Sequence, residues 1–321
     1  MLEFGVALIL PVAVGLPHAL PLHRVAPLTA ASVWLLALAL RALIALGGAL
    51  FIFVYLPQTG LFRALAEWCL HEVMPLVATH LGFSGHPVAH VALILPGLAL
   101  AASLVWLCFG LARGWLALRR LLNKTIGDGP WGSTIVPDER ILVAVTGLGA
   151  GRILVSDRAL GALDSAELEA SVAHEVGHIR RRHRPLLLLA SVLAAIARPL
   201  PGTKRAEREL AFSLERDADE YAVLRTRDPL ALASAICKAA TGDPSPALTA
   251  LGGRGRTTLR VEHLLAGARR PCAVALERSA RTLAACLAVL ALALGLTLPG
   301  WALAAPSPAH VLGEHELCHH D

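Results

Sequence analysis

Long apolar stretches dominate the hydropathy pattern of this chain. A membrane span needs about 20 consecutive apolar residues, whereas apolar runs of about 10–14 are more typical of buried helices. Four stretches reach or approach the spanning length, at residues 4–20, 32–56, 91–112 and 282–304. A fifth run, 186–197, is too short and predicts a buried or membrane-skimming helix. The pattern therefore predicts a polytopic, mainly α-helical membrane protein with about four transmembrane helices.

The stretch 4–20 is the weakest of the four, because Pro11 and Pro17 interrupt it. Its start, MLEF, lacks the basic residues that open a secretory signal peptide. We therefore expect a membrane helix here.

The pattern changes between the third and fourth stretches. This segment of about 160 residues is long enough for a single hydrophobic core. A linker rich in Gly and Pro opens it, and two short β-branched runs separated by Gly147 to Gly151 then predict a β-hairpin. A small sheet followed by helical patterns predicts an α+β domain within the mainly helical chain.

Two helices are expected after the hairpin. Asp164, with Glu167 three residues later, is typical of a capping box, and apolar residues follow at helical spacing as far as Pro185. The second helix, about 204–225, is amphipathic and strongly charged, and a Gly/Pro-rich loop follows at 241–256.

The chain therefore divides into four predicted parts. They are three N-terminal transmembrane helices in 1–112 with an outer loop at 57–90, a domain at 113–281, a fourth transmembrane helix at 282–304, and a short tail rich in His and Cys at 305–321.

Basic residues are distributed very unevenly. Of the 29 Lys and Arg, 26 lie between Arg113 and Arg281. Lys and Arg near span ends favour the cytoplasmic side. We therefore expect a multi-pass protein of the cell inner (cytoplasmic) membrane, with 113–281 in the cytoplasm and both 57–90 and the C-terminal tail outside.

The net charge of +5 is explained by this loop bias and by anionic lipid headgroups. We expect the lipid bilayer as a partner and no direct contact with nucleic acid. The six cysteines form no CxxC pair, so no disulfide framework is expected.

The stretch AHEVGH carries the clearest chemical signal. His174 and His178 are four residues apart, so on a helix both imidazoles lie on one face and can bind one ion. A catalytic zinc takes three protein ligands and keeps a position for water. Glu175 is placed to act as the general base on that water, which makes it the candidate catalytic residue.

The charged second helix supplies candidates for the rest of the site. Glu215 is the expected third metal ligand, and Asp219, one turn later, is expected to accept the N–H of a ligating histidine and fix its tautomer. The alternative is an ordinary solvated helix face, as Glu207 and Glu209 nearby illustrate.

LDSAELEASVAHEVGHIRRRH, with its later Glu-x-x-x-Asp helix, resembles the gluzincin-type integral membrane metallopeptidases. It is most similar to the BlaR/MecR-type antirepressor family, which places its zinc domain between a third and a fourth membrane helix. Arg260 to Leu264 resembles a later element of that family. The HtpX/Ste-type membrane proteases share the motifs and are related.

The resemblance implies a zinc metalloendopeptidase with one Zn²⁺ per chain and a protein or peptide substrate. A transcriptional repressor in a signalling circuit is the substrate that the antirepressor likeness implies. The alternatives are a quality-control protease of HtpX type and a catalytically silent membrane receptor. No penicillin-binding domain follows the fourth predicted span, so antibiotic sensing is not expected.

Other residues of the domain have less definite roles. Tyr221, Arg260 and His263 are candidates for oxyanion stabilisation or for structural roles, and His183 is expected at a surface or interface. The strand at Ile153–Ser156 is a candidate edge for an extended peptide substrate, or a plain structural edge.

The C-terminal tail gathers histidines, a cysteine and carboxylates. Such tracts bind borderline metals, although a solvated terminus is the alternative. The candidate ligands of an outer metal site are His310, His315, Cys318, His319 and His320.

Overall fold

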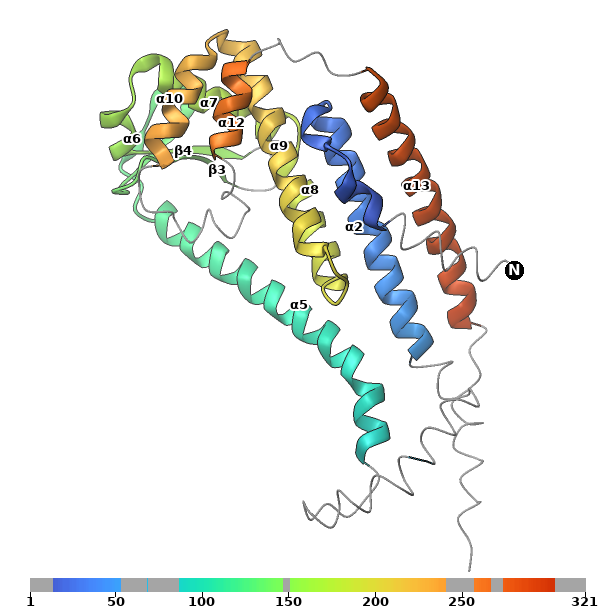
Figure 1. Cartoon of the computed structure of the whole chain (residues 1–321). Coiled ribbons are helices and arrows are strands. Elements are labelled where there is room, and N and C mark those ends of the chain that lie inside the picture. Colours follow the sequence, from blue (N-terminus) through green and yellow to red (C-terminus); the bar gives the residue numbers. More distant parts are fainter. Residues whose placement is uncertain are drawn as a thin grey trace, which may run out of the picture.

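Three long apolar helices dominate the computed structural model, which describes residues 14–52, 68, 87–146, 151–240, 257–266 and 274–303 (Figure 1). They are α2 (Pro27–Leu50), α5 (Pro87–Leu122) and α13 (Val274–Leu303). Each contains a segment long and apolar enough to cross a membrane. Three of the predicted spans therefore correspond to such helices, whereas most of 4–20 lies outside the described residues.

The helices extend further than the apolar stretches that predicted them. α5 continues past residue 112 through Arg113 and Arg119, whose guanidinium groups lie over the rings of Phe109 and Trp115. Each of these pairs is spaced i, i+4, so both members lie on one helix face. α13 likewise begins at Val274, before the apolar run at 282. Basic residues at the end of an apolar stretch therefore do not end the helix, because their side chains continue the i, i+4 contacts along the same helix face.

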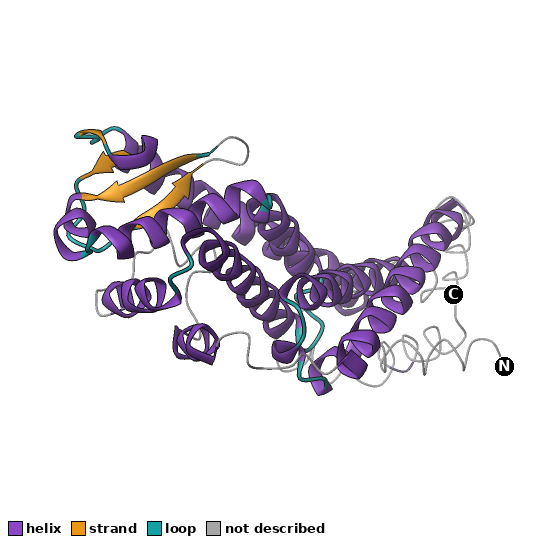
Figure 2. Ribbon diagram, turned by 90° about the horizontal axis from the view of Figure 1, so that it is seen from above, coloured by secondary structure: helices purple, strands orange, loops and turns teal. Residues whose placement is uncertain are grey.

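The described residues form a four-stranded sheet of order β1-β2-β4-β3. Figure 2 shows its strands in orange at one end of the molecule, packed against helices. The strands are β1 (Gly127–Asp128), β2 (Thr134–Val136), β3 (Val143–Thr146) and β4 (Arg152–Ser156). β3 and β4 pair antiparallel, which confirms the predicted hairpin. The prediction of an edge at Ile153–Ser156 is wrong, because β2 pairs in parallel with the other side of β4. The edge strand on that side of the sheet is β3.

Helices follow the sheet in close succession. They are α6 (Asp157–Ala162), α7 (Ser165–Arg180), α8 (His183–Ile196), α9 (Thr203–Thr226), α10 (Pro229–Ala240) and α12 (Thr257–Ala266), and two short 3-10 turns lie at Leu22–Arg24 and Pro130–Gly132. α9 matches the predicted charged helix, and 241–256 lies outside the described residues.

α7 begins at the predicted capping box. The Asp164 carboxylate accepts from the Glu167 amide and the Glu167 carboxylate accepts from the Asp164 amide, both at 2.8 Å. The prediction that Pro185 ends this helix is wrong: α7 ends at Arg180, and Arg182 turns the chain with φ 53°. Pro185 lies in the first turn of α8, where its missing N–H costs no helical hydrogen bond.

α8 and the first half of α9 form a helical hairpin that runs alongside α2, with α5 on its other side (Figure 1). Ala190 and Ala194 of α8 and Leu210 of α9 are buried in one cluster with Leu38 of α2. The run 186–197 thus belongs to a helix that buries one face against α2 and α9, and it does not form a separate membrane span.

The sheet and α7 share a second core. Val145 and Val155 from the strands pack with Leu168 and Val172 of α7. One face of α7 packs on the sheet, so the opposite face of α7 is left to pack against α9.

Glu167 also connects α7 to α10. Its carboxylate accepts hydrogen bonds from Ser234 (2.5 Å) and Lys238 (2.6 Å). Burial alone raises the pKa of Glu167, but the hydrogen bonds from Lys238, Ser234 and the Asp164 amide outweigh it and lower the pKa. A carboxyl whose pKa is depressed by folding stabilises the fold above its unfolded pKa and loses that contribution as the pH falls through the folded pKa.

We expect Glu167→Gln to lower the thermal unfolding midpoint at pH 7, because hydrogen bonds to a charged group contribute about 1.5–3 kcal/mol. The difference from the wild type should shrink as the pH falls below the unfolded pKa of about 4.3. Unfolding of the detergent-solubilised protein measures this, with Glu169→Gln, an exposed carboxylate on α7, as the control. Equal midpoints for Glu167→Gln and Glu169→Gln at pH 7 would contradict it.

Candidate metal centre

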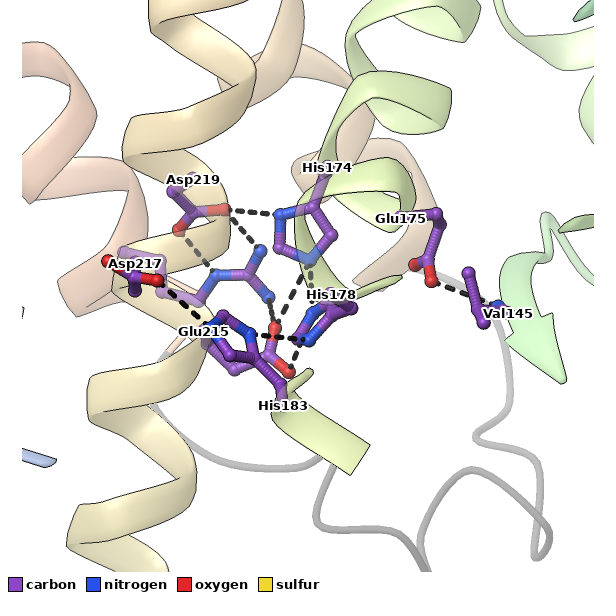
Figure 3. A network of polar contacts seen from close by, with 9 residues as sticks. Val145, His174, Glu175, His178, His183, Glu215, Asp217 and Asp219 are labelled. Carbon is purple, nitrogen blue, oxygen red and sulfur yellow. Dashed lines mark hydrogen bonds and ion pairs between the residues drawn. The ribbon is translucent and has the colours of Figure 1, made fainter. Parts of the chain in front are cut away.

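Three metal-ligand atoms converge between α7 and α9 (Figure 3). His174 Nε2 and His178 Nε2 lie 3.1 Å apart, Glu215 Oε2 lies 3.4 Å from the first, and Glu215 Oε1 lies 3.6 Å from the second. Ligand atoms about 2.0–2.1 Å from a tetrahedral zinc are about 3.3 Å from one another. The structure therefore brings together the predicted ligand set at a spacing that suits one zinc ion.

The far sides of both imidazoles are already engaged. His174 Nδ1 lies 2.9 Å from Asp219 Oδ1, and His178 Nδ1 lies 3.0 Å from His183 Nδ1. With the protons on both Nδ1 atoms, the Nε2 lone pairs face each other beside a carboxylate. Such a group of acceptors is stabilised by a cation at its centre, so the donor set fits a metal ion.

The neighbouring carboxylates and burial shift the pKa values of His174 and His178 in opposite directions. Burial lowers the pKa of His174, but the carboxylates of Asp219 and Glu215 outweigh it and raise the pKa to about 10. Burial lowers the pKa of His178 to about 3. The pair thus holds one positive charge between its rings and the carboxylates, where a metal ion would supply it instead.

Arg260 of α12 holds both carboxylates of α9. Its Nε and Nη2 donate to Asp219 at 2.9 and 2.7 Å, and its Nη1 lies 2.9 Å from Glu215 Oε2. Burial raises the pKa of both acids, but the charge of Arg260 and the contacts with His174 outweigh it. The pKa of Asp219 falls to about 2 and that of Glu215 falls well below its usual value. Both acids are therefore ionised, as a ligand and an orienting group must be.

His183 has a place that sequence reasoning missed. The expectation of a surface or interfacial residue is wrong, because His183 is fully buried. Its Nε2 lies 2.9 Å from Asp217 Oδ2, and Arg181 pairs with the other oxygen of Asp217. His178, His183 and Asp217 form a chain that fixes the tautomer of the second ligand, as Asp219 does for the first. The α7–α8 turn brings His183 back to the site, and no local pattern marks that turn.

Glu175 lies beside the ligands on α7 and faces the sheet. Its Oε2 accepts a hydrogen bond from the Val145 amide of β3 at 2.9 Å (Figure 3). Burial raises the pKa of Glu175 to about 7, against the lowering effect of the charge on His174. A carboxylate with such a pKa both accepts and returns a proton near neutral pH.

The remaining candidates are distributed around this centre. The Tyr221 ring packs close to Gly177 and under the Arg181 guanidinium, so its observed contacts are those of packing. The Arg260 guanidinium pairs with the carboxylates of Glu215 and Asp219, and a part in oxyanion stabilisation stays a prediction. His263 is half-buried on α12, and its role stays a prediction. The tail with His310, His315, Cys318, His319 and His320 lies outside the described residues.

Comparison with known proteins agrees with this centre. Residues 125–237 match the model of Peptidase family M48. The chain is 34% identical over 101 residues to the plastoglobule-localized metallopeptidase 48, chloroplastic, of Arabidopsis thaliana. The family match covers the sheet, α7 and α9. The alignment with the plant relative covers 29% of this chain and 29% of the length of that relative. No solved structure matches.

The contacts from His178 to His183 and from His183 to Asp217 lead to a prediction about metal affinity. We expect His183→Ala and Asp217→Ala each to weaken zinc binding about 10- to 100-fold, because groups that orient ligating histidines contribute that much. Zinc titration against a chelating indicator measures it, with Glu169→Gln as the control. Unchanged affinity in both variants, with the fold intact, would show that the chain does not position His178.

Proposed function

We propose that this protein is an integral membrane zinc metalloendopeptidase that holds one Zn²⁺ per chain at His174, His178 and Glu215. The observation that carries the proposal is the convergence of these ligand atoms next to Glu175, a half-buried carboxylate with a raised pKa. The Peptidase family M48 match over this region supports it.

Each residue of the centre has a distinct part in peptide hydrolysis. When bound, the zinc ion lowers the pKa of a water molecule and polarises the scissile carbonyl. Glu175 accepts a proton from the attacking water and passes it to the leaving amine. Asp219 and His183 keep the Nε2 atoms of the two histidines directed at the site.

The substrate is proposed to lie along β3. The Ser156 amide donates to the Leu142 carbonyl, and the Leu142 amide donates to the Ser156 hydroxyl. The alternation of an antiparallel pair then points the amides of Val143 and Val145 away from β4. The Val145 amide does point away from β4, to Glu175. An extended peptide added at this edge passes directly beside Glu175.

The three apolar helices support a membrane location. The bias of Lys and Arg toward 113–281 supports the proposal that the metal centre faces the cytoplasm. In this orientation a cytoplasmic protein can reach the site, and a transcriptional repressor is the substrate that the antirepressor resemblance implies.

Proteolysis by the purified chain in detergent tests the activity. We expect Glu175→Gln to retain one zinc per chain and to lose at least about 100-fold in kcat, the contribution of a general base. Glu215→Gln should lose both zinc and activity, and Glu169→Gln should keep both. A zinc-replete wild type that cleaves no unfolded protein substrate would favour the silent receptor instead.

The raised pKa of Glu175 predicts the pH dependence. The base must be ionised, so kcat/KM should rise with pH along an acidic limb. A bound cation next to the carboxylate lowers its pKa, so we expect the midpoint of this limb at or below pH 7. The pH profile of peptide cleavage measures it, and activity that falls with rising pH through this range would contradict the assignment.

A further inference from the structure

The turn between α8 and α9 lines an open, strongly cationic cavity. It has a volume of about 300 Å³. Four of its lining side chains are basic: Arg198, Lys204, Arg205 and Arg208. All four are exposed at the tip of the hairpin, away from the metal centre. The residues that line the cavity include no acid.

No carboxylate of the described chain forms an ion pair with these four cations. Arg208 Nε donates to the Lys204 carbonyl, which uses one of its donors. Glu207, on the same turn of α9, is half-buried and accepts a hydrogen bond from Ser191 of α8 at 3.2 Å. Burial raises the pKa of Glu207, and the charges of Arg198 and Lys204 oppose this rise, so Glu207 compensates part of their charge. The remaining positive charge of the cavity is available to an anion.

The backbone adds to the positive potential. α9 starts at Thr203 without a side-chain cap. The Thr203 hydroxyl instead lies 2.9 Å from the carbonyls of Ala197 and Leu200 and closes the turn. The N-terminus of this long helix thus lies at the cavity, which Gly202 and Thr203 line, and helix N-termini favour anions.

A fifth cation lies behind the turn. Arg41 of α2 is fully buried, and its guanidinium contacts the Val14 carbonyl and His18. A Cβ at Gly202 would lie only 2.9 Å from His18 Nε2 and 3.3 Å from Arg41 Nη2, so the turn packs directly on this pair. Arg41 has no ion pair with a described carboxylate. Its charge reinforces the cavity from the α2 side.

The position of the cavity indicates which anion it binds. The hairpin lies against α2, a candidate span, and exposed Leu189 of α8 and Leu292 of α13 present apolar surface on neighbouring helices. Incompletely compensated cations beside hydrocarbon are costly, and basic pockets between membrane helices bind anionic headgroups. We propose that this cavity binds the phosphate headgroup of an anionic phospholipid, with the acyl chains along α2 and α8.

The test compares lipid retention in matched variants. Full-length protein is placed in nanodiscs of phosphatidylcholine with phosphatidylglycerol in equal parts, and lipid that stays bound after transfer to detergent is quantified by native mass spectrometry. Arg205→Gln/Arg208→Gln removes two cavity charges. Arg158→Gln/Arg225→Gln, two exposed cations outside the cavity, is the control with the same change in net charge. Zinc content reports folding in each variant.

We expect the wild type and the control to retain phosphatidylglycerol preferentially. The cavity variant should bind it roughly 30-fold more weakly, because each cation near an anionic surface contributes about a factor of five. Retention by the cavity variant equal to that of the control would overturn the proposal. A further arm titrates inorganic phosphate into protein in phosphatidylcholine nanodiscs. Phosphate binding without any preference for phosphatidylglycerol would also overturn it, because the ligand would then be a free anion.

Discussion

Charge compensation between α7, α9 and α12 is the constraint on which the metal centre depends. Asp219 is buried and Glu215 is half-buried one turn before it on α9, and both stay ionised because Arg260 of α12 pairs with them. Removing Arg260 would leave two like charges in a water-poor interface. The same carboxylates direct His174 toward the site. The charged residues that make α9 amphipathic are therefore the same residues that complete the metal site.

Much of this arrangement could be predicted from the sequence because it is local. The capping box at Asp164 fixes the start of α7, and the i, i+4 spacing then places His174 and His178 on one face. The charged helix containing Glu215 and Asp219 follows at a spacing known from the gluzincin resemblance. These predictions depend on helical periodicity, which a short sequence window contains in full.

The missed features depend on contacts between segments. Arg182 adopts a left-handed conformation that returns His183 to the site, and Arg residues carry no signal for that geometry. β2 lies in a segment whose composition is that of a linker, and its parallel pairing with β4 makes β3, not β4, the edge strand. The role of Arg260 depends on a contact between α12 and α9, which are far apart in the sequence. Strand order and long-range ion pairs are tertiary facts, so composition and spacing leave them open.

α9 is a continuous helix of 24 residues that joins two distant parts of the molecule. Its first turn lines the cationic cavity, and ten residues after Arg205, about 15 Å along its axis, it presents Glu215. A hydrogen-bonded helix resists compression and carries a shift at one end to the other. A small axial displacement of the α8–α9 turn would therefore move one metal ligand relative to the two on α7, so the geometry of the metal site is mechanically connected to the depth at which the hairpin lies.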